Sequence, residues 1–202
     1  MAQADAVLDY WFADAATDPV AAGARNAFWF RSSTEVDAEI AARFSATIDA
    51  AANGSLDVWQ ASPRGTLAFI LVCDQFPRNV WRGTPRAFSL DARALAAAHH
   101  ADDTGLFAKL TPVERAFALL PFEHSEALAD QRLCVARFEA LHREAPEAWQ
   151  PLLAGHADYA RQHLALIERF GRFPHRNRLL GRESTAEERA FLAGGGAVFG
   201  QG

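Results

Sequence analysis

Apolar residues recur three and four positions apart along most of this chain, the spacing that places them on one face of an α-helix. The clearest stripe consists of Val36, Ile40, Phe44, Ile48 and Ala51. The apolar run at residues 67–73 fits a strand or a buried helix by its pattern alone. Ser62 and Pro63, a helix cap followed by proline at the first helical position, favour the helix. The sequence therefore predicts helical segments throughout, without strands.

Local capping signals mark where several helices begin and end. Residues 111–114 (TPVE) form a capping box with proline at the first helical position, and residues 184–188 (STAEE) carry a second capping pattern. Thr34 is expected to cap the helix that stops at Asn53-Gly54, and Gly171 is expected to stop the last long helix. These signals divide the chain into short helices with brief connections.

Three short motifs combine an aromatic residue and a proline with polar side chains. They are residues 74–79 (DQFPRN), 121–126 (PFEHSE) and 172–177 (RFPHRN), the first, second and third motifs. Proline has no amide hydrogen and disfavours helical geometry in the residue before it. We therefore expect helices to end before Pro77, Pro121 and Pro174. A loop over residues 79–88 and a one-turn helix over residues 174–180 should follow the first and last of these ends.

Length and composition predict one globular domain. The chain has 202 residues, of which 50% are hydrophobic and 22% charged, so it can bury a sizeable core but is short for two domains. We expect a single all-α domain over residues 1–202, in which residues 193–202 are a glycine-rich tail. The brief connections favour an antiparallel array or an irregular bundle of about eight to ten helices.

Charge, cysteine content and the N-terminal sequence exclude several classes of protein. The formal net charge of −5 provides no basic field for nucleic acid or an anionic membrane. Cys73 and Cys134 stand in apolar surroundings without zinc-type spacing, so we expect buried, reduced thiols. The N-terminus lacks a signal-peptide pattern, and the longest apolar run is too short to span a membrane. A cytoplasmic location is the prediction.

The three motifs supply the candidate site, because antiparallel helices bring alternate ends together and these ends are unusually polar. The catalytic candidates are Glu123, His124 and His175, since a carboxylate can orient an imidazole whose pKa lies near neutrality. The ligand-binding candidates are Asp74, Gln75, Arg78, Asn79, Glu126, Arg176 and Asn177. We expect the three motifs to line one cavity, whose arginines would bind a small carboxylate or phosphate.

Two other interpretations of these residues stay open. The same arginines and asparagines are suited to bracing helix ends, where the last carbonyl groups lack partners. A helical array can also bind a protein or peptide partner in a groove, which exposed apolar and aromatic side chains would mark. No metal or other cofactor is expected, because no metal-binding spacing such as H-E-x-x-H occurs.

Several histidines and aromatic residues outside the motifs are expected to be structural. His156 and His163 share the buried face of the last long helix, where a hydrogen-bonded core role is favoured over catalysis. The aromatic cluster at residues 28–30 is expected to anchor the core. The adjacent His99 and His100 point to different faces of a helix and are expected at the surface.

With its motifs identified, the chain resembles the bacterial domain-of-unknown-function family 924. The resemblance rests on the first and second motifs and on residues 170–177 (FGRFPHRN) and 180–184 (LGRES), in this order along the chain. It implies a tetratricopeptide-like helical array, which agrees with the helix count above. It implies no particular reaction, because the biochemical activity of the family is unassigned.

Overall fold

The computed structural model of the protein describes residues 2–31 and 33–199. These residues form nine α-helices and no strand, as the periodicity predicts. The helices are α1 (Ala2–Phe12), α2 (Pro19–Phe30), α3 (Thr34–Ala52), α4 (Pro63–Val80), α5 (Asp91–Asp103), α6 (Pro112–His124), α7 (Leu128–Glu144), α8 (Gln150–Phe170) and α9 (Ala186–Ala193). Short 3₁₀ helices lie at Ala13–Ala16, Asp57–Ala61, Pro85–Phe88, Leu106–Lys109, Glu147–Trp149 and Pro174–Arg176. The fold is a packed helical array.

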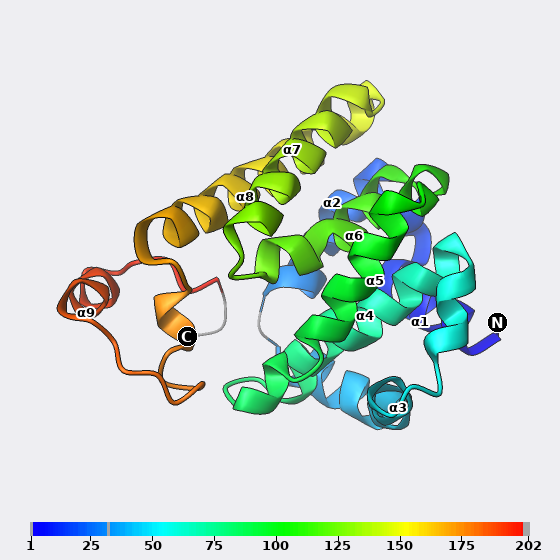
Figure 1. The fold of residues 1–202 in the computed structure, drawn as a ribbon. Coiled ribbons are helices and arrows are strands. Elements are labelled where there is room, and N and C mark those ends of the chain that lie inside the picture. The colour runs from blue at the N-terminus through cyan, green and yellow to red at the C-terminus, as the bar shows by residue number, and fades with distance from the viewer. Residues whose placement is uncertain (1, 32, 200–202) are drawn as a thin grey trace.

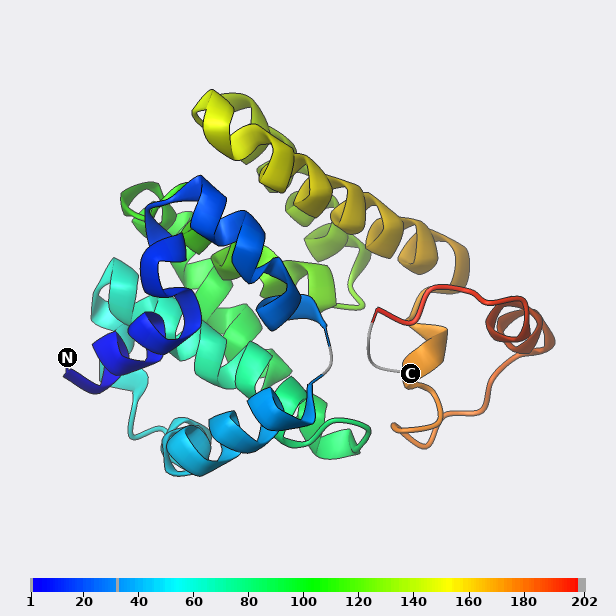
Figure 2. The ribbon, with the colours of Figure 1, turned by 180° about the vertical axis from the view of Figure 1, so that it is seen from behind.

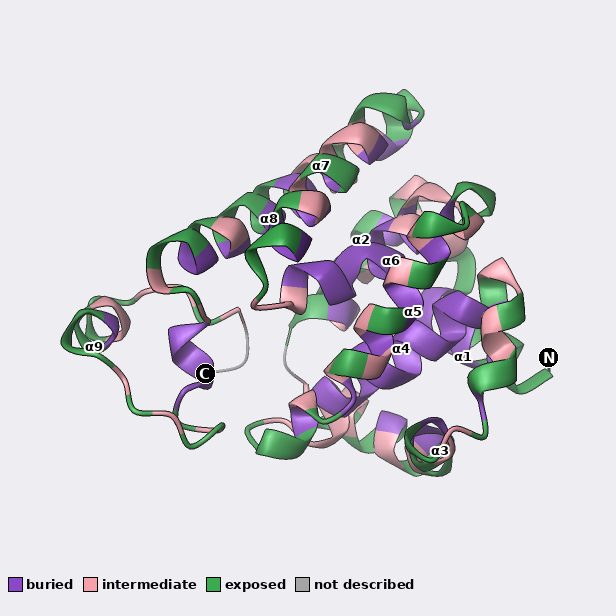
Figure 3. Ribbon diagram, viewed as in Figure 1, coloured by how far each residue is buried: buried purple, intermediate pink, exposed green. Residues whose placement is uncertain are grey.

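Helix α4 is the centre of the fold. It contacts α1, α3, α5 and α6 (Figure 1), and every residue from Gly65 to Arg78 is buried. Figure 3 shows this burial along most of the helix. A helix that is covered on all sides needs apolar residues on all faces, which is why residues 67–73 show no helical stripe. The interpretation of that run as a buried helix is confirmed.

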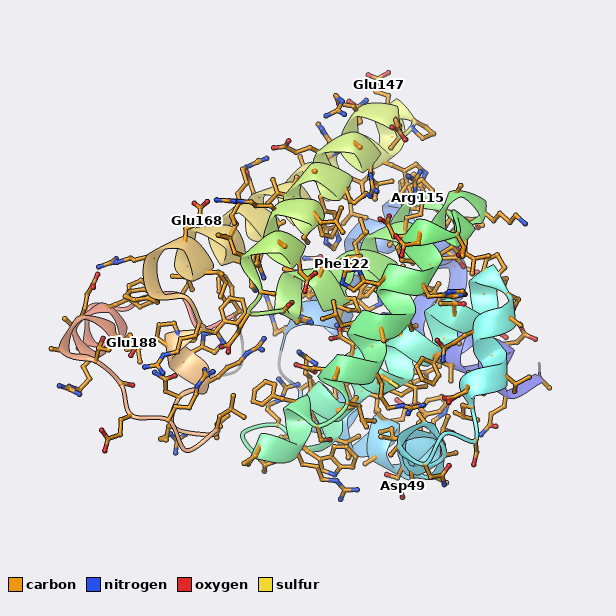
Figure 4. The ribbon with its side chains drawn as sticks, viewed as in Figure 1. Asp49, Arg115, Phe122, Glu147, Glu168 and Glu188 are labelled. Atoms are coloured by element: carbon orange, nitrogen blue, oxygen red, sulfur yellow. The ribbon has the colours of Figure 1, made fainter. Side chains whose placement is uncertain are left out.

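Helices α7 and α8 pack along each other and form an arm beside α2 and α6 (Figures 1 and 2). After α8 the chain forms a C-terminal segment with α9, at the end of the molecule farthest from α1 (Figures 1 and 2). Buried and exposed side chains separate in the same way. In Figure 4 the buried Phe122 lies at the centre of the array, and the exposed Asp49, Glu147 and Glu168 lie at its periphery.

The capping signals were mostly read correctly. Ser62 accepts a hydrogen bond from a backbone amide at the start of α4, and the capping boxes at Thr111 and Thr185 are both formed. Gly171, with a left-handed φ of 67°, ends α8. The prediction for α3 was wrong by one residue, because the side chain of Ser33, and not of Thr34, caps this helix. Serine and threonine are both good caps, so the local sequence does not separate them.

Two predicted helix ends are wrong. α4 continues through Pro77 to Val80, and α6 continues through Pro121 to His124. An interior proline removes one intrahelical hydrogen bond and costs about 3 kcal/mol. Burial of the surrounding side chains offsets this cost, since Phe76 alone is fully buried and burying a phenylalanine stabilises by about 1.5–3 kcal/mol. The polar residues of the first two motifs therefore belong to helices.

The remaining local predictions were partly correct. The irregular stretch after α4 is shorter than residues 79–88 and contains the 3₁₀ helix Pro85–Phe88. The one-turn helix of the third motif is the 3₁₀ helix Pro174–Arg176 and does not extend to residue 180. Cys73 and Cys134 are buried free thiols, as predicted.

Candidate functional site

A cavity of about 290 Å³ lies between the faces of α2, α4, α6 and α8. Its α4 side consists of Gln75, Arg78, Asn79 and Arg82. The first three lie on α4 and are three and four positions apart, the spacing of one helical face, and Arg82 follows the end of the helix at Val80. Glu123 and His124 of α6 line the adjoining wall. Because both helices continue past their prolines, the first two motifs present their polar side chains to the same space.

The opposite wall comes from α8 and α2. α8 contributes Leu152, Gly155, His156, Tyr159 and His163. The last turns of α2 contribute Asn26, Trp29 and Phe30, and Arg31 follows the helix. His156 and His163 are both buried, as expected, but both also line the cavity. The sequence signal for this wall was the presence of two histidines on an otherwise apolar stripe. Of the aromatic cluster in α2, Trp29 is buried in the core and Phe30 is 47% exposed at the cavity.

Asp74 and His124 form a pair across α4 and α6. His124 Nδ1 lies 2.7 Å from Asp74 Oδ1, and the side-chain amide of Gln75 donates to Asp74 Oδ2 at 2.6 Å. Burial alone raises the pKa of Asp74, but Arg78, His124 and Gln75 outweigh burial and hold it well below its ordinary value. The carboxylate is therefore ionised and accepts the Nδ1 proton. This fixes the tautomer of His124 and leaves Nε2 without a proton.

His124 itself is neutral near pH 7. Burial lowers its pKa most, the charge of Arg78 lowers it further, and Asp74 only partly opposes them. A neutral imidazole that is held by a carboxylate at one nitrogen can accept a proton at the other. The cavity wall thus contains a group with the properties of a general base.

Glu123, next to His124 in α6, is a candidate proton donor, because its pKa is raised. Burial, and then the negative charge of Asp74, raise its pKa to about 8, so the carboxyl group is protonated near pH 7. Its Oε1 lies 3.6 Å from Nδ1 of His163, while Oε2 is buried without a hydrogen-bond partner. Neighbouring groups whose pKa values are pushed apart are typical of an acid and a base in one site.

Three buried polar atoms on the cavity lining lack hydrogen-bond partners. They are Arg78 Nε, Glu123 Oε2 and His156 Nε2. Buried polar groups in proteins are almost always hydrogen-bonded, so each such atom requires an explanation. Arg78 Nε and a protonated Glu123 can both donate, which suits a ligand that carries acceptor oxygens.

The charges that line the cavity are positive. Arg31, Arg78 and Arg82 carry guanidinium groups, and the carboxyl group of Glu123 is uncharged near pH 7. Asp91 pairs with Arg78 at 2.8 and 3.0 Å, but this aspartate does not line the cavity. Arg82 pairs likewise with an aspartate of α3 that lies outside the lining. Arg78 and Arg82 therefore line the cavity while the carboxylates of Asp91 and α3 that pair with them are not part of its lining.

The third motif lies beside the cavity and does not line it. Arg176 donates to the backbone carbonyl of His124 at 3.0 Å and lies 3.8 Å from Asp91, the partner of Arg78. The expectation that all three motifs line one cavity is therefore wrong for the third motif, which only contacts the end of α6 beside it. His175 instead lines a second cavity, of about 250 Å³, beside the C-terminal segment. Burial and then the charge of Arg176 lower the pKa of His175 to about 4.

Glu126 and Asn177 form a brace with Arg182. Both oxygens of Glu126 accept from Arg182, at 2.6 and 2.9 Å, and one also accepts from the backbone amide of Phe173. Asn177 accepts from Arg182 Nε at 3.0 Å and donates to Ser184 at 3.0 Å. These contacts tie the C-terminal segment to the end of α6. Neither Glu126 nor Asn177 reaches the lining of the first cavity.

In residues 2–31 and 33–199, no three His, Cys, Asp or Glu side chains are grouped so that they could hold a metal ion. Over the same part of the chain, no helix is both long and apolar enough to cross a bilayer. His99, which was expected at the surface, pairs with Asp130 at 2.9 Å and is partly exposed.

Comparison with known proteins decides the family. The family described as "Bacterial protein of unknown function (DUF924)" matches residues 7–196. The chain belongs to this family. A solved structure, that of the protein of unknown function ATU0120 from Agrobacterium tumefaciens, is 34% identical and has a TM-score of 0.79, over 95% of this chain and 97% of that one. No curated protein matches the chain.

Proposed function

We propose that this DUF924 protein binds a small anionic molecule, a carboxylate or a phosphate, in the cavity between α2, α4, α6 and α8. The observation that carries the proposal is the set of unpartnered buried atoms on the lining, Arg78 Nε, Glu123 Oε2 and His156 Nε2. A ligand with acceptor oxygens would satisfy the donors among them. The volume of about 290 Å³ lies near the lower end of ordinary ligand sites, which favours a small molecule.

General acid–base chemistry on that ligand is the second part of the proposal. His124, oriented by Asp74, would accept a proton at Nε2, and Glu123 would donate one. Gln75, Arg78 and Asn79 would bind the anion, and Arg176 would support His124 through its backbone carbonyl. His175, Glu126 and Asn177 would stabilise the C-terminal segment beside the site.

The tetratricopeptide-like scaffold that binds a peptide is the alternative, and it has weaker support. Large apolar side chains that are exposed within the described residues are spread over several elements: Val20 and Phe30 of α2, Val58, Leu128 of α7, Tyr159 of α8, Leu180 and Val198. A binding groove would instead gather such side chains into one patch. The polar cavity therefore carries the main proposal.

The experiment is a thermal-shift screen of carboxylates and phosphates with a variant that fills the cavity. Gly155 lines the cavity, and a Cβ atom added to it meets no other atom within 4 Å, so we use Gly155→Leu to place a larger side chain at the cavity wall. Gly23→Leu is the matched control, since Gly23 also lies in a helix with open space and is outside the lining.

At 100 times its Kd, a ligand stabilises the folded state by about 2.7 kcal/mol. For a chain of this size the melting temperature should rise by roughly 5–10 °C. We expect this shift for the unmodified protein and for Gly23→Leu, and its loss in Gly155→Leu. Shifts with peptides alone, or shifts that Gly155→Leu leaves unchanged, would overturn the proposal.

A further inference from the structure

Phe199 is the residue of the cavity lining that comes from the C-terminal segment. Its ring stacks on the imidazole of His163, with centroids 3.6 Å apart and planes 19° from parallel. Three further rings surround it, those of Tyr159, Phe173 and His175, with centroids 6.2, 6.4 and 5.8 Å away. The chain's own phenylalanine thus fills an aromatic niche on the α8 side of the cavity.

The backbone that carries this ring is in an unusual conformation. Phe199 has a φ of 48°, in the left-handed region that bulky side chains rarely adopt. Four residues earlier, Gly195 has a φ of 79°, and a Cβ atom added to Gly196 would collide with the ring of Phe191. Strained residues that persist in a structure concentrate at binding sites and switch regions. Phe199 combines this strain with a place on the cavity wall.

The niche has the chemistry of a ring-binding subsite. Burial lowers the pKa of His163 to about 3, so its imidazole is uncharged near pH 7 and presents a flat aromatic face. Flat rings gain from stacking in addition to the burial of their apolar area. Arg78 and Arg82 lie on the α4 side of the same cavity, opposite the wall that α8 and α2 form. The cavity therefore has an aromatic side and a cationic side.

We propose that Phe199 occupies a subsite for the planar ring of the ligand, and that the ligand is a small aromatic carboxylate or aryl phosphate. Its ring would replace the Phe199 ring on His163, and its anionic group would meet the arginines. The inference rests on the proposed function and specifies that the anionic ligand carries a planar aromatic ring. It also makes Phe199 an internal competitor, so the tail must move when the ligand binds.

The test compares ligands that differ only in ring aromaticity. Benzoate and phenyl phosphate are titrated beside cyclohexanecarboxylate and cyclohexyl phosphate, by calorimetry, against the unmodified protein, Phe199→Ala and Val198→Ala. Val198 is the control because it is in the same tail but lines only the second cavity. Gly155→Leu reports whether binding occurs in the first cavity.

We expect at least one aromatic anion to bind more tightly than its saturated counterpart. Phe199→Ala should tighten that binding by roughly tenfold, since it removes the competitor, and Val198→Ala should not. Equal binding of aromatic and saturated anions, or weaker binding in Phe199→Ala, overturns the ring subsite. If Gly155→Leu still abolishes binding in those cases, the proposed function stands without the subsite. Absence of binding by all four anions in every variant overturns both.

Discussion

His124 Nδ1 lies 2.7 Å from Asp74 Oδ1, so the imidazole at the end of α6 is held by a carboxylate of the central helix α4. The guanidinium of Arg78 lies 3.1 Å from the same oxygen. One buried carboxylate therefore has two roles. It offsets the charge of Arg78, and it fixes the tautomer of His124 so that Nε2 is the basic nitrogen.

Asp74→Asn removes both roles, and two different measurements report on them. Removing one charge from a buried pair leaves the other uncompensated, so we expect a loss of about 3 kcal/mol in the free energy of unfolding. The amide can still accept a hydrogen bond, but it no longer selects the Nδ1-protonated form. Nitrogen NMR of the His124 ring should therefore show a mixture of tautomers where the unmodified protein shows one.

The control for that substitution is the other aspartate–histidine pair. Asp130 and His99 lie 2.9 Å apart, but the His99 side chain is 43% exposed. Asp130→Asn should cost about 1 kcal/mol, since exposed pairs contribute little and one hydrogen bond from Ser125 is weakened. A single tautomer of His124 in Asp74→Asn would contradict the assignment of Asp74 as its orienting group.

Glu123→Gln should change how stability depends on pH. The folded-state pKa is about 8, against 4.5 for an ordinary glutamate, so between these values the folded protein keeps a proton that the unfolded chain has lost. The contribution of Glu123 to the free energy of unfolding must then fall as pH rises, by about 4 kcal/mol from pH 5 to pH 8. Urea denaturation at both pH values should show this fall in the unmodified protein relative to Glu123→Gln.

The control for this substitution is Glu168→Gln, at an exposed position of α8, which should behave like the unmodified protein. Equal pH dependence in Glu123→Gln and the unmodified protein would mean that Glu123 is ionised in the fold.

The helices were predictable because their signals are local. Ser62, Thr111 and Gly171 act on backbone groups within one turn, so the sequence contains the whole interaction. Pro77 and Pro121 were misinterpreted because their outcome depends on burial by distant elements, which offsets the lost hydrogen bond. The competition between a local cost and tertiary packing is not visible in a window of a few residues.

The candidate site was predictable only in part, for a similar reason. Gln75, Arg78, Asn79, Glu123 and His124 were recognised by the density of polar groups beside prolines, and they share a cavity. The α8 wall carried a weaker signal, because a histidine on an apolar stripe is ordinarily a core residue. Phe199 carried none, since a glycine-rich tail has no periodicity from which its packing could be inferred.

Glu126→Ala distinguishes bracing from ligand binding at the end of the second motif. The change removes the carboxylate that accepts from Arg182 and from the amide of Phe173, while Arg182 keeps its bond to Asn177, so we expect a loss of about 2–3 kcal/mol in the free energy of unfolding. Anion binding should be unchanged, because Glu126 is outside the cavity lining. Glu139→Ala, which removes an exposed partner of Arg161, should cost little or nothing. Weaker anion binding at unchanged stability would instead assign Glu126 to the ligand site.

His156→Phe should make the protein more resistant to acid. The imidazole lies parallel to the ring of Phe138 at 5.6 Å, so a phenyl ring suits the same place, and Nε2 has no partner to lose. Burial lowers the pKa of His156 from 6.5 to about 4. As pH falls from 6.5 to 4, the unfolded chain takes up a proton that the folded protein resists, and stability is lost.

The expected size of this loss is about 3 kcal/mol, at 1.36 kcal/mol per pKa unit. Urea denaturation gives the free energy of unfolding at pH 7 and at pH 4. The loss between these pH values should be about 3 kcal/mol smaller in His156→Phe than in the unmodified protein. His100→Gln, at an exposed position of α5, is the control and should leave the difference unchanged. His163 and His175 act in the same direction and Glu123 in the opposite one, so only the comparison between variants isolates His156. An unchanged difference in His156→Phe would show that His156 gains its proton as easily in the fold as in the unfolded chain, and Nε2 would then be open to solvent through the cavity.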